Sequence, residues 1–167
     1  MLDAGCGEGK NAAFLSTLGA QVDAFDLSAA AIANARQAWP PRPGLTYAVA
    51  DARHHAWSPG NYDLVIAYGL LHCLASPGEI EDVIARLQRA TRLHGHAIVC
   101  VFNDRVQDLA AHPGFAPTLM SHAWYLDHFA SWTLESATDQ DLWETHPHNN
   151  IRHCHSMTRL IARKAAP

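Results

Sequence analysis

The stretch Leu2-Asp3-Ala4-Gly5-Cys6-Gly7-Glu8-Gly9-Lys10-Asn11 decides the fold of this chain. A short apolar strand end runs into glycines at alternate positions, and a helical pattern follows at once. Glycine lets a backbone turn sharply and approach a ligand without a Cβ in the way. The spacing G-x-G-x-G behind an acidic residue differs from the G-x-G-x-x-G of dinucleotide enzymes. The stretch therefore predicts a ligand-binding loop, with an ordinary tight turn as the alternative.

A second acidic residue favours the ligand-binding loop. The run from Ala20 to Ser28 predicts a strand that ends at Asp26. In a βαβ unit, a carboxylate about 20 residues beyond the glycines lies where it can accept both hydroxyls of a ribose. Asp26 or Ser28 also suits the N-cap of a helix that begins near Ala29. We expect Ser28 to be the cap and Asp26 to be the ribose ligand.

Asp3 narrows the class of ligand. A carboxylate before the glycines suits a ligand whose tail is an amino acid, because the carboxylate can meet the ammonium group directly or through water. S-adenosylmethionine (SAM) has such a tail, and we expect it to be the cofactor.

Length and composition limit the number of domains and the class of protein. The 167 residues suffice for one domain with a sizeable core, so we expect a single domain over 1–167. Hydrophobic residues make up 49% and charged residues 17%, which is typical of a soluble globular protein. The net charge of -4 argues against a nucleic-acid or anionic-membrane partner. The cysteines are scattered without a C-x-x-C pair, which favours a reduced, cytoplasmic protein.

Strand and helix patterns alternate along the chain, which predicts an α/β, doubly wound, mainly parallel sheet with helices on both faces. The predicted strands after the second are Leu45–Ala50, Tyr62–Tyr68 and His96–Phe102. The predicted helices are Ser28–Ala38, Pro77–Arg92 and Ser121–Ala130. We expect His94-Gly95 to close the second of these helices. Residues 103–130 are predicted to be an insertion over the active face, and residues 131–164 a C-terminal β-hairpin.

Further candidates lie at the ends of the predicted strands, where ligands bind in open α/β sheets. Asp51, with Ala52, can hydrogen-bond the exocyclic amine of adenine, or Asp51 can cap a turn. Tyr68 lies next to the reactive centre of the cofactor, or it packs in the core. His72 either faces the pocket or caps the next helix.

These motifs together resemble the class I SAM-dependent methyltransferases over about the first 100 residues. The remainder resembles, more loosely, the tellurite-resistance (TehB-like) branch of small-molecule and thiol methyltransferases. That resemblance implies a Rossmann-like, seven-stranded sheet whose last two strands form an antiparallel hairpin. The cofactor positions that the motifs and the resemblance mark are Asp3, Gly5, Gly7, Gly9, Asn11, Asp26, Leu27, Asp51, Ala52 and Tyr68. Related methyltransferases carry N-terminal helices that cover the cofactor. These helices are missing from this sequence, so we expect either a truncated reading frame or an open pocket.

Histidines cluster near the C-terminus, in the stretch from Glu144 to His155. A two-residue turn at Asn149-Asn150 would pair His146 with His153 and Glu144 with His155. Paired residues share a face of a hairpin, and side chains alternate along a strand. The predicted common face then carries Glu144, His146, His148, His153 and His155.

Three interpretations of this face stay open. The five side chains suit zinc or another divalent metal, so all are candidate ligands. They equally suit a substrate or catalytic wall, with His146, His148, His153 and His155 as donors or bases. The third alternative is a solvent-facing hairpin without a role. The resemblance implies that His146 faces the substrate, and we expect His112 and His122 to reach the same pocket.

The predicted function is methyl transfer from SAM to a small-molecule acceptor: a thiol, a halide, a chalcogen oxyanion or an imidazole-type nitrogen. A non-catalytic SAM- or metal-binding protein is the alternative. A nicotinamide-dependent oxidoreductase is disfavoured by the glycine spacing.

Overall fold

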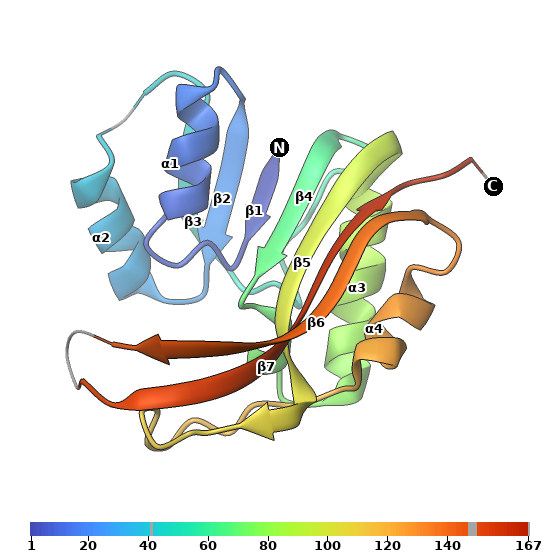
Figure 1. The fold of residues 1–167 in the computed structure, drawn as a ribbon. Helices are drawn as coiled ribbons and strands as arrows, with labels where there is room; N and C mark the ends of the chain where they lie inside the picture. The colour runs from blue at the N-terminus through green and yellow to red at the C-terminus, as the bar shows by residue number, and fades with distance from the viewer. Residues whose placement is uncertain (41, 147–149, 167) are drawn as a thin grey trace.

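A seven-stranded sheet forms the centre of the molecule, in the order β3-β2-β1-β4-β5-β7-β6 (Figure 1). The structure is a computed structural model that describes residues 1–40, 42–146 and 150–166. The strands are β1 (Leu2–Ala4), β2 (Val22–Asp26), β3 (Leu45–Val49), β4 (Tyr62–Tyr68), β5 (Thr91–Gln107), β6 (Thr133–Thr145) and β7 (Arg152–Arg163). Strands β1 to β5 pair in parallel, and β7 runs antiparallel to both of its neighbours. This arrangement confirms the predicted fold class.

Helices cover the two faces of the sheet. They are α1 (Lys10–Thr17), α2 (Ala29–Ala38), α3 (Pro77–Ala90) and α4 (His122–His128), with a short 3-10 helix at Leu71–Cys73. Ser28, Ser76 and Ser121 cap α2, α3 and α4, each by accepting a hydrogen bond from a backbone N–H three residues on. The cap at Ser28 was predicted. No helix within 1–40, 42–146 and 150–166 has both the length and the apolar content needed to cross a membrane.

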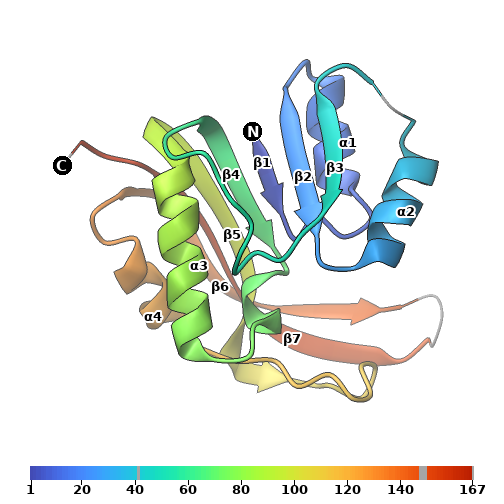
Figure 2. The same ribbon diagram turned by 180° about the vertical axis from the view of Figure 1, so that it is seen from behind.

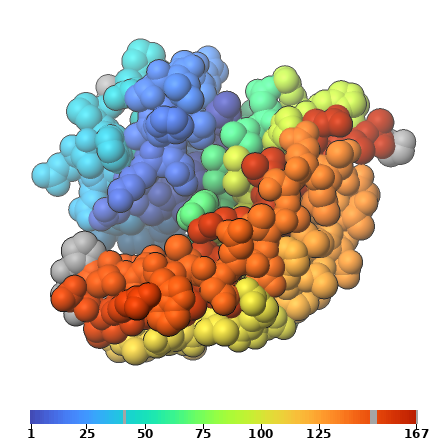
Figure 3. Space-filling view, in the orientation of Figure 1, coloured from blue at the N-terminus to red at the C-terminus, as the bar shows by residue number. Residues whose placement is uncertain are grey.

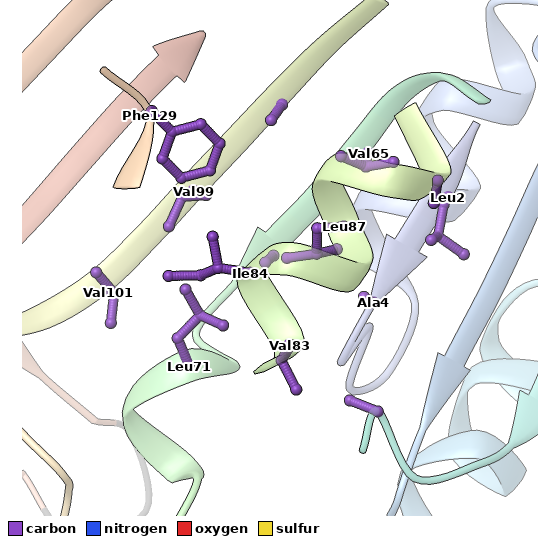
Figure 4. Packing of buried hydrophobic residues seen from close by; sticks show 14 of the residues in the cluster. Leu2, Ala4, Val65, Leu71, Val83, Ile84, Leu87, Val99, Val101 and Phe129 are labelled. Carbon is purple, nitrogen blue, oxygen red and sulfur yellow. The ribbon is translucent and has the colours of Figure 1, made fainter. Parts of the chain in front are cut away.

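The main core lies between the sheet and the two helices α3 and α4 (Figure 2). Apolar residues recur on one face of α3 at helical spacing, and Val83, Ile84 and Leu87 are buried there. Figure 4 shows Ile84 on the side of Val99 of β5 and Leu87 on the side of Val65 of β4. Strand β1 lies in the middle of this core, and all of its residues are buried.

The opposite face is covered by α1 over β2 and β3. A smaller apolar cluster there joins Ala12 of α1 to Val22 and Ala24. Over β4 and β5, apolar side chains such as Leu64 and Ile98 line an open hollow. In Figure 3 atoms of β4 and β5 show between α1 and the β6–β7 hairpin. Among the described residues, no helix lies over this part of the sheet.

The boundary between α3 and β5 differs from the prediction. The helix ends at Ala90 rather than at Arg92, and β5 begins at Thr91 rather than at His96. The pairing with β4 is irregular here, because Tyr62 opposes Thr91 while Leu64 opposes His96. His94 has a φ of 64°, so the residues before Gly95 form a bulge in the strand rather than a last helical turn.

Strand β5 also continues past its predicted end at Phe102. It reaches Gln107, which pairs with His155 of β7 after a second irregularity. The first residues of the predicted insertion 103–130 therefore belong to the sheet. The continuous apolar run ends at Phe102 and mostly polar residues follow it, so the sequence pattern did not indicate this extension.

The hairpin has a different register from the predicted one. Glu144 opposes His153, and Leu142 opposes His155, because β6 ends at Thr145 and β7 begins at Arg152. The connection is therefore longer than the predicted two-residue turn. It closes with a hydrogen bond from the Asn150 N–H to the His146 carbonyl (2.8 Å). The error is two residues, an even number, so Glu144, His146, His153 and His155 still share a face. His148 and Asn149 lie outside the described residues.

Candidate functional site

The glycine loop between β1 and α1 is built on positive φ angles. Gly5, Gly7 and Gly9 have φ values of 70°, 53° and 76°. A Cβ at Gly9 would lie 2.6 Å from the Tyr47 hydroxyl, and one at Gly5 would lie 3.0 Å from the Leu70 side chain. A Cβ at Gly7 would meet open space. Packing therefore leaves no room for a side chain at Gly5 or Gly9. At Gly7 the space beside the backbone is open to a ligand.

Asp26 is held at the carboxyl end of β2 by two backbone donors. The N–H of Gly7 donates to Oδ2 and the N–H of Ser28 donates to Oδ1, both at 2.8 Å. An ionised carboxylate has about four lone-pair sites. Asp26 therefore keeps acceptor capacity on both oxygens for the hydroxyls of a ligand.

A pocket of about 260 Å³ opens beside Asp26. It lies at the carboxyl ends of β1 to β4, where open α/β sheets bind ligands. The predicted residues that line it are Gly5, Asp26, Leu27, Asp51 and Ala52. A larger hollow of about 510 Å³ lies at the opposite end of β1, beside Met1 and Asp23. That end faces away from the glycine loop, so the smaller pocket is the candidate site.

Asp51 forms part of an ion-pair network on the pocket wall. The Arg53 guanidinium lies 2.6 Å from the Asp51 carboxylate. It also lies 3.2 Å from the carboxylate of Glu79, which is in the first turn of α3. The hydrogen bonds from Arg53 lower the pKa of Asp51 to about 2. The Arg53 N–H also donates to Asp51 (2.9 Å), so the turn role is confirmed. Adenine binding by Asp51 stays a prediction. The sequence pattern did not single out Arg53 and Glu79.

Asp3 is a buried carboxylate without a hydrogen-bond partner. Its exposed fraction is 1%, and neither oxygen is within hydrogen-bond geometry of a donor. Burial raises the pKa of Asp3 to about 6; the nearby N–H of Ala12 opposes this rise and Asp26 adds to it. A buried charged group without a partner is costly unless a ligand neutralises it. Asp3 therefore suits a cationic group such as the ammonium of an amino acid.

Tyr68 and Asn11 lie outside this pocket. Both line the open hollow on the α1 face, together with Phe14, and the Tyr68 side chain is half exposed. The structure thus brings Gly5, Asp26, Leu27, Asp51 and Ala52 together around the pocket, with Asp3 buried near Asp26. It places Tyr68 and Asn11 on the neighbouring face. Their contact with a cofactor stays a prediction.

The histidines of the hairpin converge on one point. We use the term hairpin cluster for His112, Glu144, His146, His153 and His155. Nε2 of His112 lies 3.2 Å from Nε2 of His153 and 3.3 Å from Nε2 of His146. The side chains of His153 and His155 have no exposed surface, so the solvent-facing interpretation is wrong for them. His112 reaches this cluster as predicted, whereas His122 contacts Thr158 instead (3.1 Å).

A stack of rings links the hairpin cluster to the pocket. His72 stacks on Phe102 at 4.2 Å between ring centroids, and Phe102 stacks on His155 at 4.1 Å. His72 follows the pocket residues Gly69 and Leu70. Its Nδ1 accepts a hydrogen bond from the Phe102 N–H, and burial lowers its pKa to about 4, so it is neutral near pH 7. His72 does not cap α3, because Ser76 does.

Comparisons with known proteins agree with this geometry. A curated relative, hemagglutinin 1 of Eikenella corrodens, is 31% identical over 138 residues, which are 80% of this chain and 43% of that protein. The chain thus spans less than half of that relative. A solved structure concerning the conversion of a disulfide bond into a thioacetal group during echinomycin biosynthesis is 30% identical. It matches 98% of this chain and 75% of its own, with a TM-score of 0.76.

Other solved structures share the fold of this chain, and a family model matches its N-terminal part. TehB from Haemophilus influenzae shares the fold with a TM-score of 0.78 and 19% identity, over 98% of this chain and 57% of its own. Other solved SAM-dependent methyltransferases share the fold over at least 98% of this chain. The family model described as a methyltransferase domain matches residues 1–95, which is more than half of the chain. With the glycine loop, Asp26 and the pocket at the carboxyl edge, this match shows that the chain belongs to the methyltransferase domain family, whose solved relatives use SAM.

Proposed function

We propose that this chain transfers the methyl group of SAM to a small-molecule nucleophile. The observation that carries the proposal is the pair of carboxylates at the glycine loop. Asp26 is anchored and open to hydroxyls, and Asp3 is buried and lacks a partner. SAM carries a ribose and an ammonium group, so its two ends match the two carboxylates. The family match supports the same reaction class.

Three carboxylates in or near the pocket would each hold a different part of SAM. Asp26 would accept the ribose hydroxyls, Asp51 would accept the adenine amine, and Asp3 would pair with the ammonium group. Bound there, SAM supplies a methyl group on a sulfonium, which is transferred by in-line displacement. The task left to the protein is to align the acceptor and exclude water.

For the acceptor, we propose a small thiol, within the TehB-like branch of the family. The relative at 30% identity concerns sulfur chemistry, which supports this choice. A thiolate attacks without a strong base, because it is already the nucleophile. Halides and chalcogen oxyanions share this property, whereas an imidazole-type nitrogen needs a base. We propose that residues 103–130 and the hairpin of residues 131–164 enclose the acceptor and that His146 faces it.

The state of the cysteines supports a reducing compartment. All four are free: Cys6, Cys73, Cys100 and Cys154. Burial raises the pKa of Cys6 to about 12, so this thiol next to the pocket stays protonated and does not compete as a nucleophile. We propose a cytoplasmic location on this basis.

A screen with methyl-labelled SAM tests the proposal and the role of His146. Thiols, halides, chalcogen oxyanions and imidazoles are offered in turn, and labelled product is counted. We expect turnover with a thiol, and we expect His146→Ala to lower kcat at least tenfold while SAM affinity is unchanged. His96→Ala is the matched control, because His96 lies at the far end of β5, 3.4 Å from Glu135. Equal rates in both variants would exclude His146, and no product with any acceptor would refute the proposal.

A further inference from the structure

Four members of the hairpin cluster, His112, Glu144, His153 and His155, come from three separate segments of the chain. Glu144 is near the end of β6, His153 and His155 are on β7, and His112 lies in the connection between β5 and α4. One ligand atom from each of these four residues lies within 4.8 Å of all the others. Among the described residues, this is the only group of its kind.

The separations approach those of a metal site. In a tetrahedral zinc site with bonds of about 2.0–2.1 Å, neighbouring ligand atoms are about 3.3 Å apart. Here His112 Nε2 and His153 Nε2 are 3.2 Å apart, and His153 Nε2 and Glu144 Oε1 are 3.5 Å apart. His155 Nε2 lies 3.9 Å from the same Glu144 oxygen. Small rotations of the side chains would bring all four atoms onto one ion.

The Nδ1 atoms of His153 and His155, which point away from the centre of the cluster, already make hydrogen bonds. Nδ1–H of His153 donates to the Ile151 carbonyl (2.8 Å), and Nδ1–H of His155 donates to Oε1 of Gln107 (2.8 Å). The Gln107 amide is itself oriented, because its Nε2 donates to the carbonyls of Asn103 and Ser156. In the neutral ring, a proton on Nδ1 leaves the lone pair on Nε2. Both lone pairs therefore face the centre of the cluster, as metal-bound histidines require.

His155 supplies a second and independent observation. Its side chain has no exposed surface, and its Nε2 has no hydrogen-bond partner. A buried acceptor without a donor is costly. His112 Nε2 lies within hydrogen-bond distance of His153 Nε2, so a proton there would serve His153 and leave His155 without a donor. A cation at the centre would satisfy both at once.

We propose that His112, Glu144, His153 and His155 bind one divalent transition-metal ion, zinc by the nature of its ligands. Three imidazoles and one carboxylate suit zinc, whereas calcium and magnesium prefer all-oxygen ligands. The ion cross-links the β5–α4 connection and the β6–β7 hairpin. Through the stack of His155, Phe102 and His72 it also fixes the wall next to the pocket. His146 lies outside this set, and its proposed role toward the acceptor is separate from the metal.

The test is a zinc titration of the full chain without an affinity tag, because a histidine tag would itself bind zinc. Metal is first removed by dialysis against a chelator, and zinc is then titrated against a chromophoric competitor. We expect one zinc per chain. Zinc at about a hundredfold excess over its Kd should raise the Tm by about 5–10 °C.

Variants separate the proposed site from adventitious binding. Glu144→Gln and His112→Ala should each weaken zinc binding at least tenfold, and Gln107→Ala should weaken it about 10–100-fold through the orientation of His155. Glu135→Gln on the same strand is the matched control for Glu144→Gln, because Glu135 contacts Arg163 and His96 away from the cluster. Co²⁺ replacing zinc should give the visible absorption of a tetrahedral site in the wild-type chain and in Glu135→Gln only.

Two results would overturn the proposal: less than one zinc per chain in the wild type, or equal zinc affinity in His112→Ala, Glu144→Gln and the wild type. Circular dichroism of each variant confirms that it is folded. The titration contains no SAM and no acceptor, so its outcome is independent of the proposed methyl transfer.

Discussion

At the scale of single residues, two neighbouring carboxylates play different parts. Asp26 accepts two backbone hydrogen bonds at the pocket rim, whereas Asp3 is buried without a partner. The pKa of Asp3 rises to about 6 because burial disfavours its charged form. The free protein therefore carries an unfavourable charge above that pH, which a cationic ligand relieves.

This difference predicts how stability depends on pH. The pKa of Asp3 in the folded chain, about 6, lies above its value of 3.8 in the unfolded chain. The stability that this difference contributes to the folded state is therefore fully present below pH 3.8 and is lost as pH rises through about 6. Asp3→Asn removes this dependence. We expect the variant to gain up to about 3 kcal/mol of unfolding free energy relative to wild type between pH 4 and pH 8. Chemical denaturation at several pH values measures it.

SAM is the control for that experiment. With SAM bound, the ammonium group pairs with the charged Asp3, so the gain of Asp3→Asn over wild type at pH 8 should vanish. A gain that is the same at pH 4 and pH 8, or one that SAM leaves unchanged, would contradict the proposed role of Asp3.

At the scale of elements, the glycine loop is fixed by β3 as well as by its own conformation. Gly7 and Gly9 both have positive φ, but only a Cβ at Gly9 would collide with Tyr47. We expect Gly7→Ala to cost about 1 kcal/mol, the usual penalty of a left-handed residue with a side chain. Gly9→Ala should cost at least about 2 kcal/mol more, as an overpacked site does.

Thermal unfolding of both variants measures this difference. Gly7→Ala is the matched control, because it shares the backbone strain without the collision. A double variant, Gly9→Ala with Tyr47→Leu, should recover part of the loss. Equal destabilisation by the two single substitutions would show that Tyr47 does not restrain the loop.

The sequence predicted the elements that local patterns specify. The bounds of β4 and the Ser28 cap of α2 were correct, because a continuous apolar run and a capping serine are local signals. The start of β5 was wrong, because a bulge around His94 extends the strand where the pattern favoured a helix end. The hairpin register was wrong by two residues, because the length of the connection is not readable from Asn149-Asn150 alone.

At the scale of the whole molecule, the candidate site unites both ends of the chain. The glycine loop follows β1, and the hairpin cluster is formed by the β6–β7 hairpin and the β5–α4 connection. The rings of His72 and Phe102 lie between the two sites. The shared face of the hairpin histidines was predictable from alternation. Arg53, Gln107 and Phe102 were not, because their roles depend on long-range contacts that carry no sequence motif.

A calorimetric titration with SAM and with NAD tests the proposed SAM-dependent methyl transfer at its first step, the binding of the cofactor. Two hydrogen bonds to a charged group are together worth about 3–6 kcal/mol, so Asp26→Ala should weaken SAM binding at least a hundredfold. Asp82→Ala, on the exposed side of α3, is the control and should bind as the wild type does. We predict one SAM per chain, no binding of NAD, and loss of SAM binding only in Asp26→Ala. Binding of NAD instead of SAM, or unchanged SAM affinity in Asp26→Ala, would contradict the proposed SAM site.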